Sequence, residues 1–253
     1  MDARTIALIV FASIFGSAMI GFLLGQGVLQ RHLDNESKDI VKLATGLIAT
    51  LSALVLGLLV STAKGTFDQV NNELTQTAVK VVVLDRVLAE YGPEAKDVRA
   101  LLKTSYTEAT APLISGDEYQ QEKSDSPQGV ARLEGIQAAV RALVPKTEAQ
   151  KGLQARAIQI SNEIASSRWL LVIQRQGSIS VPLLVIMVFW LSVIFGCWGL
   201  FSPRNLVVAA ALLASALSVS GATFLILEMD RPLTGWIRVS SLPMERAVSH
   251  LGE

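Results

Sequence analysis

Four long runs of apolar residues, none containing a charged side chain or a histidine, dominate the hydropathy pattern of the chain. Each run has about the 20 residues that a helix needs to cross the ~30 Å hydrocarbon core of a bilayer. They form two pairs on either side of a hydrophilic stretch, at residues 6–24, 43–63, 181–201 and 206–227. The pattern predicts four transmembrane helices, numbered here as spans one to four. Because no ionisable residue lies inside a span, the usual marker of a proton relay or coupled transporter is missing.

The hydrophilic stretch between spans two and three shows helical periodicity. Apolar residues recur every three or four positions along its first part, as on a buried helix face; they are Phe67, Val70, Leu74, Ala78, Val81, Leu84, Leu88 and Tyr91. Gly92-Pro93, Pro112 and Pro145 mark expected helix ends, and 116–128 is the expected loop. We therefore expect an all-α membrane protein. Its parts would be spans one and two in 1–63, a helical bundle in 64–178 that continues the spans, spans three and four in 179–228, and a C-terminal tail in 229–253.

The basic residues near the span ends indicate an orientation. With four spans, both termini and the insert lie on one side, beside Arg4, Lys64, Arg168, Arg175, Arg231 and Arg238. The other side has Arg31, Lys38, Lys42 and Arg204. The excess of Lys and Arg favours a cytoplasmic insert with cytoplasmic termini.

Composition narrows the classes of function. Hydrophobic residues make up 51% of the chain and the formal net charge is zero, so no electrostatic field favours a nucleic acid as partner. One cysteine, Cys197, and two histidines, His32 and His250, give no spacing typical of a metal site or a catalytic triad. We expect no metal and no cofactor.

Carboxylates in the insert are the remaining route to an enzyme. Asp85, Glu90 and Glu94 are available as acid or base groups, but Arg86 and Lys96 stand among them. This mixture is typical of a solvated helix surface. The sequence therefore predicts that the protein is not an enzyme.

Small residues follow one another at intervals of four in spans one and four. Such stripes let helix backbones approach closely inside a membrane. They are Ser13, Ser17, Gly21 and Gly25 in span one, and Ala210, Ala214 and Ser218 in span four. Two interpretations stay open for span one, packing within one subunit and contact between subunits. Span four is expected to pack against protein on at least one side.

Span two has a small and weakly polar stripe along its whole length. Hydroxyl side chains can simply bond to their own helix carbonyls. Alternatively the stripe lines a pore, because channels can select and gate ions with hydroxyls and apolar constrictions alone. The pore-lining candidates on this stripe are Gly46, Thr50, Ala53, Gly57 and Ser61.

A charged motif follows span four. Glu228, Asp230 and Arg231 lie at the expected membrane boundary, Pro232 ends the helix, and Trp236 is an interfacial anchor or docking residue. The simpler interpretation is a charge cluster that anchors the helix end, and the alternative is an ion or subunit contact.

Two motifs carry a resemblance to a known family. LVLGLLVSTA at 54–63 with FD at 67–68 and NE at 72–73, and LEMDRPLTGWIRVSSLP at 227–243, resemble the bestrophin-like family of four-span bacterial membrane proteins. The similarity extends over nearly the whole chain. This family carries no established activity, and the resemblance implies a location in a bacterial inner membrane.

The more distant resemblance to true bestrophins implies a role for span two. Those proteins are pentameric chloride channels whose second helix lines the pore and forms an apolar neck. The neck positions would fall on Thr50, Leu54 and Leu58, which share one helical face, although Thr50 departs from the apolar pattern. The acidic calcium clasp of bestrophins has no evident counterpart here.

The leading hypothesis is an oligomeric bestrophin-like ion channel in the lipid bilayer. Span two would line the axis and a small inorganic anion would be the permeant ion. The resemblance implies a homo-pentamer. The alternative is a non-conducting membrane scaffold or sensor whose helical insert binds a partner.

Overall fold

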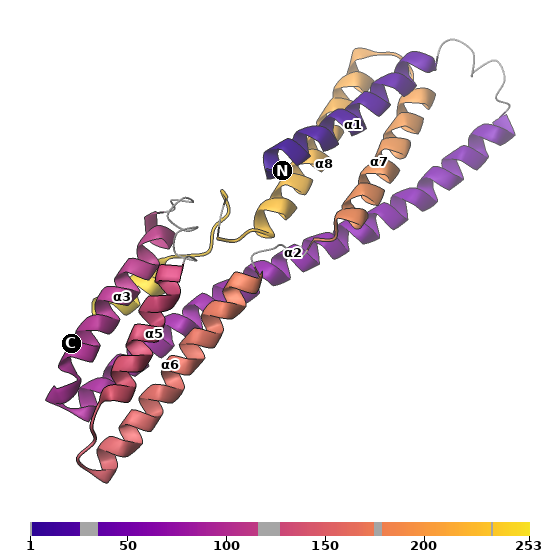
Figure 1. Cartoon of the computed structure of the whole chain (residues 1–253). Coiled ribbons are helices and arrows are strands. Elements are labelled where there is room, and N and C mark those ends of the chain that lie inside the picture. Colours follow the sequence, from indigo (N-terminus) through magenta and orange to yellow (C-terminus); the bar gives the residue numbers. More distant parts are fainter. Residues whose placement is uncertain (1, 26–34, 116–126, 175–178, 234) are drawn as a thin grey trace. The chain divides into compact units, whose positions relative to one another are not determined.

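The computed structural model describes residues 2–25, 35–115, 127–174, 179–233 and 235–253 (Figure 1). These residues form helices and turns, with no strand among them. The prediction of an all-α protein is confirmed. The elements are α1 (Ala3–Leu24), α2 (Asn35–Tyr91), the short 3-10 helix η1 (Pro93–Ala95), α3 (Lys96–Ser115), α5 (Pro127–Ala142), α6 (Glu148–Gln174), α7 (Val181–Phe201), α8 (Leu206–Met229) and α9 (Leu242–His250).

The chain divides into two compact units. The first, named here the membrane unit, comprises Met1–Thr66 and Ser178–Asp230. The second, the bundle unit, comprises Phe67–Gly177 and Arg231–Glu253. Helix α2 contributes to both units. Within the described residues, four helices are long and apolar enough to cross a membrane, namely α1, α2, α7 and α8.

The membrane unit is held together by close packing of α1 on α7 and α8. A β-carbon at Gly21 would collide with the carbonyl oxygen of Gly196, so only glycine allows α1 and α7 to approach this closely. The hydroxyl of Ser220 in α8 donates to the carbonyl of Ala7 at 2.7 Å. Side chains such as Ile14 and Ala216 fill the core between these helices.

One side of α2 also belongs to this unit. Leu59 and Ala63 pack with Leu184 and Met187 of α7 and Ile226 of α8. All five side chains are buried. The remaining sides of this half of α2 have a different environment, described below.

The bundle unit has its own apolar core. Residues 67–91 of α2 contribute the predicted stripe, which is buried from Val70 to Tyr91. Helices α3, α5 and α6 pack around it, and so does Leu251, which is 1% exposed, after α9. The sequence predicted no helix between 229 and 253. The structure places α9 there, with Met244 in a second cluster against Val70 and Leu74.

Pro112 does not end its helix, so that prediction was wrong. Helix α3 continues to Ser115. A proline inside a helix loses the hydrogen bond of its own nitrogen, and its ring crowds the carbonyl four residues before it. Burial of Pro112 offsets part of that cost. The predicted loop at 116–128 lies mostly outside the described residues, as do Arg31, His32 and Arg175. Helix α2 begins at Asn35, before the apolar run itself.

Candidate functional site

The candidate pore face lies on the membrane half of α2. All seven pore-lining candidates, which are the five residues of the stripe and the two neck residues Leu54 and Leu58, are exposed in the single chain. Leu54 is 72% exposed and Leu58 is 55% exposed. A β-carbon added at Gly46 or Gly57 would meet no atom within 4 Å. Nothing in the described part of this chain covers the stripe.

Helix geometry explains why one side of α2 is covered and the other is not. Successive residues turn by about 100°, so positions four apart stay on one side. Ser52, Leu59 and Ala63 point to the buried side, while Thr50, Leu54 and Leu58 point away from it. With a rise of about 1.5 Å per residue, the three neck positions span about 12 Å along the axis.

The chemistry of this face is neutral. Thr50 donates its hydroxyl proton to the carbonyl of Leu47 at 2.7 Å, and Thr62 donates to Leu58 at 2.9 Å. Those protons are therefore committed to the helix backbone. Since residues 43–63 also contain no ionisable group, the face offers leucine side chains and helix backbone rather than a charged binding site. Such a face can form an apolar constriction.

The two small-residue stripes differ in their surroundings. In α1, Ser17 donates a hydrogen bond to the carbonyl of Ser192, and a β-carbon at Gly25 would lie 2.7 Å from the carbonyl oxygen of Leu200. This stripe therefore contacts α7 of the same chain. Ser13, at its start, is only partly buried.

The stripe of α8 is exposed instead. Ala210, Ala214 and Ser218 all lie at the surface of the single chain. Two of them, Ala214 and Ser218, line a groove of about 480 Å³ together with Ala53 of the α2 stripe. The structure thus brings parts of the α2 and α8 stripes to one groove.

The two acidic residues of the motif after span four are largely buried. Glu228 and Asp230 are each only 7% exposed. A carboxylate oxygen of Asp230 accepts a hydrogen bond from the backbone nitrogen of Ile179 at 3.5 Å. Pro232 is buried, whereas Arg231 and Trp236 are exposed. The two acidic groups therefore belong to the packing around the end of α8.

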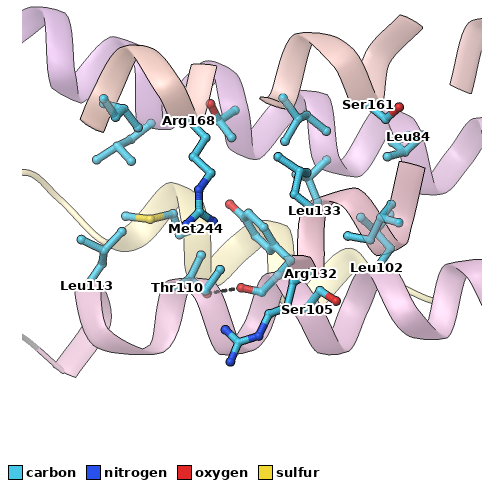
Figure 2. A pocket seen from close by; sticks show the side chains of 18 of the residues that line it. Leu84, Leu102, Ser105, Thr110, Leu113, Arg132, Leu133, Ser161, Arg168 and Met244 are labelled. Carbon is cyan, nitrogen blue, oxygen red and sulfur yellow. Dashed lines mark hydrogen bonds between the residues drawn. The ribbon is translucent and has the colours of Figure 1, made fainter. Parts of the chain in front are cut away.

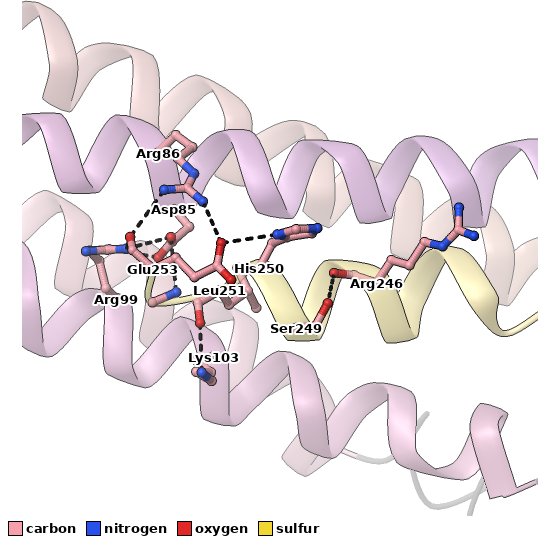
Figure 3. A network of polar contacts seen from close by, with 10 residues as sticks. Asp85, Arg86, Arg99, Lys103, Arg246, Ser249, His250, Leu251 and Glu253 are labelled. Carbon is pink, nitrogen blue, oxygen red and sulfur yellow. Dashed lines mark hydrogen bonds and ion pairs between the residues drawn. The ribbon is translucent and has the colours of Figure 1, made fainter.

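One ionisable group that the sequence interpretation placed at a solvated surface is buried. Asp85 of α2 is fully buried in the bundle unit and is held by Arg99 of α3 through a bidentate pair (Figure 3). The Nε and Nη2 atoms of Arg99 donate to Oδ1 and Oδ2 at 2.8 and 2.7 Å. The earlier assignment of Asp85 to a solvated pattern was wrong. Position 85 lies four residues after Val81 on the buried stripe, and that signal was present in the sequence.

The last residues of the chain complete this cluster. The backbone nitrogen of Gly252 donates to Asp85 at 3.3 Å, and Lys103 donates to the carbonyl of Leu251 at 2.7 Å. Arg99 and Arg86 both donate to the backbone oxygen of Glu253 (Figure 3). Burial raises the pKa of Asp85. The hydrogen bonds from Arg99 and Gly252 and the charges of Arg99 and Arg86 together lower the pKa by more, so it lies below its usual value. The lowered pKa favours the ionised carboxylate, which is consistent with a structural role for Asp85 in this cluster.

The chain is similar to a known protein family over most of its length. Residues 12–244 match the family model described as the Bestrophin-like domain. Two mutant crystal structures of a bacterial bestrophin homologue from Klebsiella pneumoniae share the fold at 12% sequence identity. The match to the first structure covers 96% of this chain and 97% of the Klebsiella chain, with a TM-score of 0.70. The second covers 98% and 99% with a TM-score of 0.68. No curated protein matches the sequence.

Proposed function

The chain belongs to the Bestrophin-like family, and from this premise we propose that it forms a homo-oligomeric ion channel whose pore is lined by α2. One observation carries the proposal. The stripe from Gly46 to Ser61 is uncharged, continuous and uncovered in the single chain. The face-to-face arrangement of such stripes around an axis would give a neutral pore.

A closed ring follows from this use of the stripe. Head-to-tail contacts between identical subunits close into cyclic assemblies, and we propose five subunits because the resemblance to bestrophins implies that number. The groove beside Ala53, Ala214 and Ser218 offers small residues for close helix contact with the next subunit. Both termini and the bundle unit would lie in the cytoplasm of a bacterial cell, as the distribution of basic residues favours.

The narrowest part of the pore would lie at Thr50, Leu54 and Leu58. Rings of leucine side chains can gate a pore by excluding water. We propose a small inorganic anion as the permeant ion, by analogy with bestrophin chloride channels. Because the Thr50 hydroxyl already donates to Leu47, gating would rest on the width of the leucine rings.

A flux assay tests this function. Purified protein is reconstituted into liposomes, and chloride efflux is compared for wild type, Leu54→Ala and Leu58→Ala. We expect the smaller side chains to raise the flux several-fold. Val185→Ala is the matched control, because Val185 is also exposed but lies on α7, outside the α2 stripe.

Two results would contradict the proposal that the protein is a channel. One is the absence of chloride flux from protein that is folded and oligomeric. The other is an equal response of Leu58→Ala and Val185→Ala. Either would favour the alternative function, a non-conducting scaffold or sensor whose bundle unit binds a partner.

A further inference from the structure

The bundle unit contains a partly open cavity of about 180 Å³ that the channel proposal does not use (Figure 2). Five helices line it, and Leu233 lies beside them. Side chains come from α2, α3, α5, α6 and α9, among them Leu84, Leu102, Leu133 and Met244. An apolar cavity of about 150 Å³ can hold benzene. The space therefore suits a ring with one small substituent.

The charged side chains that line the cavity are all positive. Two arginines, Arg132 and Arg168, line the cavity, and the described lining includes no aspartate or glutamate. In Figure 2 the Arg168 side chain extends from α6 toward Met244, inside the ring of lining side chains. The Arg132 side chain points away past α3, and its guanidinium pairs with Glu108 at 3.2 Å. By the direction of its side chain in Figure 2, Arg168 is the better placed of the two to meet a bound anion.

Hydroxyl groups add hydrogen-bonding capacity to a mostly apolar wall. The buried Oγ1 atom of Thr77, a lining residue, has no hydrogen-bond partner among the described residues. Unsatisfied buried hydroxyls are uncommon, and each one calls for a partner. Tyr106 also lines the cavity, and burial raises the pKa of its phenol, so this hydroxyl stays protonated and able to donate.

We propose that this cavity binds a small carboxylate with an apolar body, about the size of benzoate. Arg168 takes the carboxylate, and leucine side chains enclose the body. Water alone is a poorer occupant, because a buried water needs two to four polar partners and most of the lining is apolar. The proposal does not depend on whether the chain conducts ions.

Binding of 4-fluorobenzoate to the full chain in detergent micelles, followed by fluorine NMR, tests the proposal. We expect saturable binding at one site, and at least ten-fold weaker binding of the neutral analogue 4-fluorobenzyl alcohol. Ala109→Met, which fills the cavity, should weaken benzoate binding at least ten-fold. Ala100→Met is the matched control, since Ala100 lies on the same helix α3 but is exposed, and it should change the affinity less than two-fold.

The two arginines give a second matched pair. Arg168→Gln should weaken benzoate binding about ten-fold, as expected for loss of a charge-assisted hydrogen bond, and should leave the alcohol unchanged. Arg132→Gln should have less than a two-fold effect. If Ala109→Met does not fold, as judged by circular dichroism, Leu133→Phe replaces it. The proposal is overturned by non-saturable binding, by equal affinity for acid and alcohol, or by equal effects of the two arginine variants.

Discussion

The two halves of α2 have similar periodicity and opposite surroundings. In the bundle unit, Leu84 and Leu88 are both 0% exposed, enclosed by α3, α5 and α6. In the membrane unit, Leu54 and Leu58 are 72% and 55% exposed on the same continuous helix. Leucines that water would drive into a core are here left uncovered by their own chain.

The two halves of α2 differ in what covers their apolar side chains. A soluble unit must cover its apolar stripe itself, since exposed apolar area in water is unfavourable. A helix in hydrocarbon has no such requirement, so its uncovered face is free to meet lipid, a pore or another subunit. The bundle half of α2 is therefore sensitive to packing in the single chain, while the membrane half is sensitive to what surrounds it.

Truncation of matched leucines gives the largest expected contrast. Leu88→Ala should destabilise the bundle unit by about 2–5 kcal/mol, because it leaves a cavity in a closed core. Leu58→Ala should change stability by less than about 1 kcal/mol, since it removes an exposed side chain. Thermal unfolding in detergent, followed by circular dichroism, measures both. Similar losses for the two variants would mean that α2 has no such division.

Loss of the buried charge should have the next largest effect. Asp85→Asn removes the charge partner of Arg99, and we expect a loss of about 2–3 kcal/mol in the bundle unit. This is below the usual range for a broken buried pair, because the Arg99 side chain is 20% exposed and keeps its bond to Glu253. Glu90→Gln, an exposed change on the same helix, is the control and should stay near zero. A neutral result for Asp85→Asn in the same melts would remove the anchor role.

Glycines of the membrane unit give a smaller contrast. Gly21→Ala should cost about 1–3 kcal/mol, because its β-carbon would collide with Gly196 and push α1 from α7. Gly46→Ala meets nothing, and alanine should stabilise the helix by about 1 kcal/mol. Loss of helicity in graded SDS compares the two variants. Destabilisation by Gly46→Ala would indicate that a second copy already lies close to this residue.

The sequence allows prediction of some features and not others, for physical reasons. Apolar runs of bilayer length and the stripe from Val70 to Tyr91 follow from local composition and period, so the helical class could be read directly. Family membership could be read from the motif at 227–243. The partner of the α1 stripe could not, since spacing shows that Gly21 permits close contact but does not name α7. Asp85 was assigned wrongly because neighbouring charges suggested solvent, although its position on the buried stripe indicated otherwise.

Acid should affect only the bundle half of α2, and this is the smallest expected effect. The membrane half, residues 43–63, has no ionisable group. In the bundle half, burial alone would raise the pKa of Asp85, but Arg99, Gly252 and Arg86 lower it below its ordinary value of 3.8. The unfolded chain therefore binds a proton at higher pH than the folded chain. The stability that this group contributes is complete above about pH 4 and is lost as the pH falls through the lowered pKa.

A pH series of thermal melts separates this buried group from exposed ones. The pKa values of Glu94 and Glu253 are also lowered, by hydrogen bonds from Lys146 and His250 respectively, but both groups are exposed and their contribution should be screened in about 0.5 M salt. At that salt concentration, wild type should still lose stability toward acid, by at most about 1.4 kcal/mol per pH unit for one group. Asp85→Asn should flatten this slope, while Glu94→Gln should leave it unchanged. An unchanged slope in Asp85→Asn would show that the acid response of the bundle half comes from another carboxylate.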